Sequence, residues 1–172
     1  MTISAPSWNI TPWFNGFDDE RFPLALKQVK NRLNRLAAEL EEAPGLTQTT
    51  LSQWSETLLE IEDLAKLLQH VRAYVGCRTS TDSQDEQARG MASQIRDFDA
   101  QLKAVFSAIE STFRTSTDAV FEALCQSPNL ATARYALSLM KRRSDRRLDG
   151  ATEAKIGALE VHALHTWGQL YS

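Results

Sequence analysis

The chain has 172 residues, of which 42% are hydrophobic and 24% are charged, and its formal net charge is -3. This length and balance are typical of one soluble globular domain with its own core, and the small charge excludes a global field that would attract nucleic acid or anionic lipid. No apolar run reaches the roughly 18 residues of a spanning helix, and the N-terminus lacks a secretory signal. Cys77 and Cys125 fit neither a disulfide framework nor a Cys-x-x-Cys site. We therefore expect a reduced, cytoplasmic protein with no nucleic-acid or membrane partner.

Residues 1–17 are predicted to form an extended aromatic N-terminal arm. Prolines and a glycine disfavour helix there, and four large rings lie between them: Trp8, Trp13, Phe14 and Phe17. Aromatic rings gain much free energy from burial. We expect the arm to pack on the body of the protein rather than to extend into solvent.

Two long helices are predicted next, over residues 18–42 and 49–75. Their apolar residues recur at steps of three and four, which is the period of a helix that buries one face. A Pro-Gly pair ends the first helix, and Gly76 is predicted to end the second, with residues 77–81 as a connector. Two long helices joined by a short loop form an antiparallel hairpin.

A third long helix and several shorter helices are predicted to follow. The third helix covers residues 82–112, and a Thr-Ser-Thr-Asp cluster at 115–118 then breaks the chain and caps a short helix over 119–126. A Ser-Pro-Asn turn opens another helix within 127–140, and a last helix spans 152–170.

The predicted fold is all-α. No segment alternates with the period of two that is typical of a strand, so we expect essentially no sheet. Long antiparallel helices followed by shorter helices would form a single helical lobe over residues 18–172. The acidic and hydroxyl side chains around residues 79–86 lack the spacing and central glycine of a calcium-binding EF-hand loop. We interpret them as the N-terminal cap of the third helix.

Two histidines near the C-terminus are candidate metal ligands. His162 and His165 are three residues apart, close to Glu160, and can share one helix face. A zinc site needs a third or fourth ligand, and the chain contains no His-Glu-x-x-His motif. We therefore interpret them as helix-end histidines and His70 as a surface or packing residue. The 172 residues are predicted to hold no catalytic residue and no cofactor.

A basic run occupies residues 141–147. Its arginines could contact an anion or a peptide carboxylate: Arg142, Arg143, Arg146 and Arg147. Cations are also favoured at the C-terminal end of a helix by its dipole, and the interleaved aromatic residues of a nucleic-acid surface are missing. We interpret the run as a helix end or solvated loop and keep the anion or peptide contact as the alternative.

Four stretches of the chain share their order and spacing with one known family. They are Trp8-Asn9-Ile10, the segment 73–85 with its Tyr-x-x-Cys, Ser127-Pro128-Asn129-Leu130 with Tyr135-Ala136-Leu137, and Leu148 and Glu153 with Trp167-Gly168-Gln169-Leu170-Tyr171. In this order they resemble the N-terminal helical region of oligoendopeptidase F-type zinc peptidases, relatives of thimet oligopeptidase. Arg146 and Ala163 depart from the pattern, since relatives often carry His and Gly there. The likeness covers nearly all of this chain but only the front part of a typical family member.

The resemblance implies a non-catalytic lobe. In the family the zinc ligands and the catalytic Glu lie in a His-Glu-x-x-His helix much further along the chain, so none of them falls within these residues. The lobe would form part of the wall of a deep channel that admits short peptides. In the full-length protein, zinc would polarise a water and the peptide carbonyl while Glu acts as general base.

The resemblance also implies partners. They would be the downstream catalytic domain, which would dock near Trp167, Leu170 and Tyr171, and short peptides. An isolated lobe would be able to pair as a homodimer through its exposed apolar surface. The alternative is a stand-alone helical interaction or dimerisation module without enzymatic activity.

Overall fold

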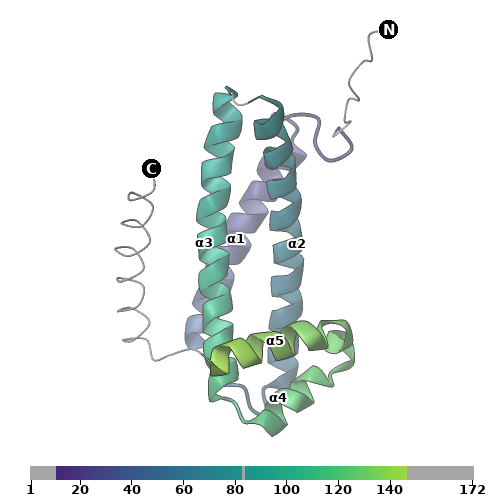
Figure 1. The fold of residues 1–172 in the computed structure, drawn as a ribbon, viewed down its shortest axis with the longest axis vertical. Helices are drawn as coiled ribbons and strands as arrows, with labels where there is room; N and C mark the ends of the chain where they lie inside the picture. Colours follow the sequence, from purple (N-terminus) through teal and green to yellow (C-terminus); the bar gives the residue numbers. More distant parts are fainter. Residues whose placement is uncertain (1–10, 83, 147–172) are drawn as a thin grey trace, which may run out of the picture.

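The computed structural model describes residues 11–82 and 84–146, and this part of the chain is helical without a strand. The predicted all-α fold is confirmed. Five α-helices and one 3-10 helix are present: α1 (Arg21–Glu42), α2 (Leu51–Thr81), α3 (Glu86–Thr115), α4 (Asp118–Cys125), η1 (Pro128–Ala133) and α5 (Arg134–Asp145). The first three form a long antiparallel bundle, while α4 and α5 lie across its lower end (Figure 1).

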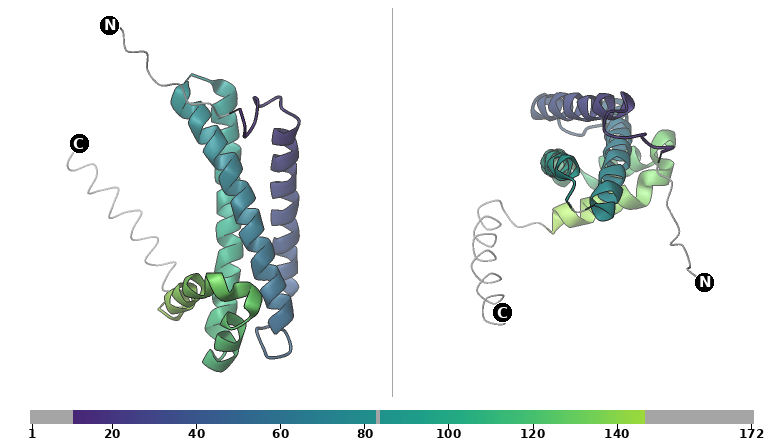
Figure 2. Two further views of the ribbon diagram at one scale, coloured as in Figure 1. Left: turned by 90° about the vertical axis from the view of Figure 1, so that its right-hand side faces the viewer. Right: turned by 90° about the horizontal axis from the view of Figure 1, so that it is seen from above.

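The bundle is held together by one apolar core. Each long helix buries the stripe that its sequence period predicts, and the three stripes meet along the bundle axis. Fully buried members include Val29 and Leu33 of α1, Leu64 and Leu68 of α2, and Ile109 of α3. Figure 2 shows the three long helices grouped around this axis, with α5 packed across the end of α3.

The second helix is longer than the sequence predicts. Gly76 does not end it, and residues 77–81 do not form a connector, because α2 continues to Thr81. The hydroxyl groups of Thr79 and Thr81 donate hydrogen bonds to carbonyls one turn earlier, and the neighbouring Val75 is buried in the core. A helical glycine costs only about 1 kcal/mol relative to alanine, so this packing outweighs it.

The caps of α3 and α4 follow the predicted pattern. The Asp85 side chain accepts a hydrogen bond from the Ala88 backbone N–H at 2.9 Å, so the acidic cluster is a helix cap as predicted. The helix therefore begins at Glu86, a few residues later than predicted, and ends at Thr115 instead of residue 112. Thr117 caps α4 in the same way.

The helix predicted to open after Ser127 has two parts. Residues Pro128–Ala133 form the 3-10 turn η1, and the α-helix α5 begins only at Arg134. The tighter turn places Leu130 in the core, where it is 2% exposed. The predicted last helix, residues 152–170, lies outside the described residues.

The described part of the arm packs on the body, as predicted. Phe14 and Phe17 are buried, whereas Trp13 is 39% exposed. Gly16 takes a φ of 137°, a value that L side chains rarely adopt, and this turns the chain into α1. Asp19 accepts hydrogen bonds from the backbone N–H groups of Asn15 and Arg21, so it closes the turn before the helix begins.

Candidate functional site

An aromatic cluster fixes the upper end of the bundle. It consists of Phe14 and Phe17 from the arm, Phe22 from α1 and Tyr74 from α2. Phe22 lies 5.2 Å from the ring centre of Phe14, 5.1 Å from that of Phe17 and 5.6 Å from that of Tyr74. Edge-to-face rings at these distances stabilise one another beyond their burial. The cluster therefore joins three segments of the chain at one point.

A charged clamp closes over the aromatic cluster. The guanidinium of Arg78 lies 5.3 Å from the ring centre of Phe17 and donates a hydrogen bond to Asp85 at 3.1 Å. The backbone N–H of Ala88 and the Arg78 guanidinium lower the pKa of the Asp85 carboxyl. Arg78 thereby connects the arm, the end of α2 and the start of α3.

The basic run does not act as one patch. Lys141 is buried, and its ammonium group pairs with Asp145 at 3.0 Å and with Asp118 of α4 at 3.8 Å. It therefore ties α5 to α4 and is not open to an external anion. Arg142 and Arg143 are exposed in the last turn of α5, where the helix dipole favours cations.

The last two arginines of the run follow α5 in the sequence. Arg146 is exposed and follows the end of α5, while Arg147 lies outside the described residues. The Arg142 side chain donates to the Ser138 carbonyl at 3.3 Å, which matches a helix-end role. An anion or peptide contact at these arginines stays a prediction.

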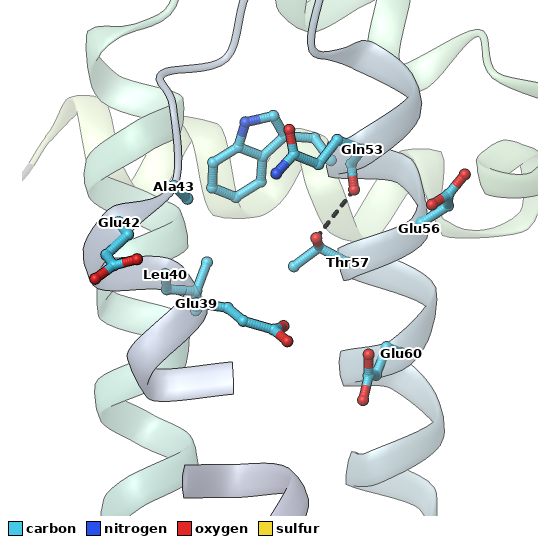
Figure 3. A pocket seen from close by; sticks show the side chains of 9 residues that line it. Glu39, Leu40, Glu42, Ala43, Gln53, Glu56, Thr57 and Glu60 are labelled. Atoms are coloured by element: carbon cyan, nitrogen blue, oxygen red, sulfur yellow. Dashed lines mark hydrogen bonds between the residues drawn. The ribbon is translucent and has the colours of Figure 1, made fainter. Parts of the chain in front are cut away.

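An acidic cleft of about 410 Å³ opens at the lower end of the bundle, between the last turns of α1 and the first turns of α2 (Figure 3). Four carboxylates line it: Glu39, Glu42, Glu56 and Glu60. Figure 3 shows Glu39 extending from α1 toward α2. Beneath the rim, Trp54 is buried, and its indole N–H donates to the Pro44 carbonyl at 3.1 Å.

Two arginines of α1 offset part of the negative charge in the acidic cleft. Arg35 pairs with Glu60 across the helices and lies 3.7 Å from Glu39. Arg32 lies 3.6 Å from the Glu60 carboxylate and donates to the Glu60 backbone carbonyl at 2.9 Å. The cleft thus presents carboxylates and the Thr57 hydroxyl, which suits a cationic or hydrogen-bond-donating group.

Sequence reasoning missed the acidic cleft. Its carboxylates come in two pairs, one at the end of the first predicted helix and one near the start of the second. An antiparallel hairpin brings such pairs together, so the signal was present in the predicted topology. We interpreted neither pair because each looks like an ordinary solvated helix face.

One histidine lies in α2, beside the rings of the arm, and the other two lie outside the described residues. The ring of His70 lies 5.4 Å from Trp13 and 5.3 Å from Phe14, so the prediction of a surface or packing role is confirmed. His162, His165 and Glu160 lie outside the described residues. Within residues 11–82 and 84–146, no three His, Cys, Asp or Glu side chains gather closely enough to hold a metal ion.

The two cysteines are free thiols in different surroundings. Cys125 is buried in α4, and burial followed by the nearby Glu122 raises the pKa of its thiol. Cys77 lies half-buried in the last turns of α2. A high pKa disfavours the thiolate that nucleophilic chemistry requires, so Cys125 serves as a core residue.

Comparisons of the chain with protein-family models, with curated proteins and with solved structures found no match. Of the helices that the structure describes, none combines the length and apolar character needed to cross a bilayer. The resemblance to oligoendopeptidase F-type peptidases therefore stays a prediction from the sequence.

Proposed function

We propose that the chain is the N-terminal, non-catalytic lobe of an oligoendopeptidase F-like zinc metallopeptidase, where it shapes the channel that admits short peptides. The observation that supports this proposal is the position of the resembling residues in the fold. Within segment 73–85, Tyr74 is buried in the aromatic cluster, and Arg78 bridges the arm to Asp85, which caps α3. These residues act as joints of the bundle, meaning that they connect separate helices to one another. Such a structural role fits a lobe that carries no catalytic residue.

The second resembling stretch with described residues is also a joint. Leu130 enters the core from η1 at the opposite end of the bundle, close to α2 and α4. Between the two joints, α2 has 31 residues and therefore a length of about 46 Å. A stiff helical wall of that length is suited to bounding a channel for extended peptides.

The first experiment is to read the coding sequence past Ser172 and express the whole frame. We expect an in-frame His-Glu-x-x-His and zinc-dependent cleavage of a short fluorogenic peptide, lost with chelator and restored by zinc. The 172-residue chain incubated with zinc should leave the same peptide intact. A frame without the motif would refute the proposal. So would cleavage by the chain alone that His165→Ala abolishes.

The second experiment tests the role of the lobe in substrate size. The intact enzyme should cleave short peptides and reject longer ones in a length series. Loosening the upper joint with Tyr74→Ala should raise the relative kcat/KM for the longer peptides, because the wall can then move. Leu24→Ala, at a site that is 55% exposed, is the matched control. An unchanged length preference in the Tyr74 variant would contradict a channel-wall role.

The alternative is a stand-alone helical interaction or dimerisation module. Its specific support is Tyr135, a large ring that is 74% exposed on α5. Such a module would end naturally at Ser172, and Tyr135→Ala would weaken its association. Sedimentation velocity over a range of concentrations distinguishes the peptidase lobe from the interaction module. A chain that stays monomeric at every concentration, together with a downstream peptidase frame, would exclude the module.

A further inference from the structure

An apolar groove of about 410 Å³ opens where α5 crosses α2 and α3. Its floor is made of core side chains, among them Leu58 and Ile61 of α2 and Leu137 of α5. Its walls include Phe106 and Met140, which are only half-buried. Figure 1 shows α5 lying across both long helices at this level.

The groove has the character of a binding surface for an apolar helix. Nine of its eleven lining residues are apolar, and the two exceptions, Glu62 and Thr132, offer few groups to hold water. Concave apolar surfaces of this size recur where an amphipathic helix inserts anchors spaced by three and four residues. The groove can accordingly take up a few apolar side chains from one face of a further helix.

We propose that the chain's own C-terminal segment, residues 152–170, docks in the apolar groove. The sequence of this segment carries apolar anchors at steps of three, four and four: Ile156, Leu159, Ala163 and Trp167. These steps place the anchors on one face of a helix. The opposite face carries Ala154 and His165 and would remain in solvent.

The length of chain beyond α5 permits this docking. Met140 lines the groove five residues before α5 ends at Asp145, which is about 8 Å along the helix. Residues 147–151 would connect α5 to the docked segment. Five residues reach up to about 17 Å, enough to turn back to the groove, and Gly150 provides the backbone freedom for that turn.

The short connection through residues 147–151 favours this segment over a second copy of the chain as the occupant of the groove. A segment linked by a few residues is present at the groove at an effective concentration of about a millimolar, well above that of a second copy at micromolar protein. The proposal does not rest on the peptidase assignment, because it concerns a contact within the chain, and it gives Trp167 a partner there in place of the downstream domain that the resemblance implies.

The experiment is hydrogen–deuterium exchange of the full chain, read on peptides covering α2 residues 58–65. Leu159→Asp should raise exchange there about tenfold, because a buried charge releases the segment. Ala154→Asp is the matched control, since it introduces the same residue on the opposite helix face and should leave exchange unchanged. Exchange in α1, which does not line the groove, reports whether each variant keeps its fold.

A second variant approaches the contact from the groove. Ala136→Arg adds a large charged side chain to an exposed α5 position without emptying the core, and it should raise exchange in residues 152–170. Unchanged exchange in both the Leu159 and Ala136 variants would overturn the proposal. It would also be overturned if groove protection fell on dilution together with a dimer-to-monomer change in light scattering, because a second copy would then be the occupant.

Discussion

Phe22 provides the sharpest test of the aromatic cluster. Its side chain is 1% exposed and contacts the rings of Phe14, Phe17 and Tyr74. Truncating a buried Phe to Ala typically costs about 3–5 kcal/mol of unfolding free energy. Because Phe22→Ala would also remove three ring–ring contacts, we expect a value in the upper half of that range. Phe22→Leu, which keeps most of the volume, should cost less.

The assay is urea unfolding followed by circular dichroism at equilibrium. With a denaturant dependence of about 2 kcal/mol per molar urea, a loss of 3–5 kcal/mol lowers the midpoint by about 1.5–2.5 M. Leu24→Ala on the same helix is the matched control, since its side chain is 55% exposed and should change stability by less than about 0.5 kcal/mol.

A double-mutant cycle then measures the coupling energy between Phe14 of the arm and Phe22 of α1. Phe14→Ala and Phe22→Ala together should cost less than the sum of the single changes, with a coupling of about 0.5–1.5 kcal/mol. A Phe22→Ala cost below about 1 kcal/mol would refute the cluster as the joint of the bundle. Strict additivity of the two changes would refute direct contact between the arm and α1.

Two further predictions follow from the perturbed pKa values. The pKa of Asp85 is lowered, so its carboxylate stabilises the fold above the ordinary carboxyl pKa of 3.8, and this stabilisation is lost as the pH falls through the lower folded value. Asp85→Ala should therefore lower the Tm by roughly 2–4 °C at neutral pH. The difference in Tm between the unmodified protein and the variant should become smaller in acid. A difference that grows in acid would contradict the lowered pKa of Asp85. The pKa of Cys125 is raised and its thiol is buried, so Ellman's reagent should modify Cys77 first and Cys125 only after urea is added. Equal rates for the two thiols, located by peptide mapping, would show that α4 does not shield Cys125.

The sequence predicts the helices well where burial alone decides. The steps of three and four in the first three long helices correspond to the buried stripes that form the core. The helix cap at Asp85 and the break before α4 are likewise local, since each depends on a side chain within three residues. The aromatic arm follows from composition, because few surfaces other than the core suit so many rings.

The misplaced end of α2 shows the limit of local signals. Gly76 lowers helix propensity by a small amount, whereas the buried neighbours Tyr74 and Val75 and the Arg78 clamp stabilise the helix on both sides. The ring contacts of Tyr74 come from the arm, far away in the sequence, and the Arg78 hydrogen bond comes from Asp85, beyond the end of the helix. The prediction weighed a glycine in isolation, and tertiary packing reversed the outcome.

Lys141 shows the same limit for charges. Read along the chain, it is one of five cations in a run of seven residues and suggests an exposed basic patch. In the fold it turns inward and pairs with Asp118 and Asp145. The pair with Asp145 is a local i,i+4 contact, but the pair with Asp118 depends on how α5 is turned relative to α4, which no window of the local sequence contains.

The two ends of the bundle have different physical characters, and this bears on how a peptidase lobe would work. The upper end is fixed by edge-to-face rings and the Arg78 clamp, so α1, α2 and α3 are held there at set positions. The lower end combines the acidic cleft with charge pairs such as Arg35 with Glu60, which screen and rearrange more readily than packed rings. Movement of α1 relative to α2 should therefore begin at the acidic cleft. High salt would weaken the cleft pairs and leave the aromatic cluster unchanged.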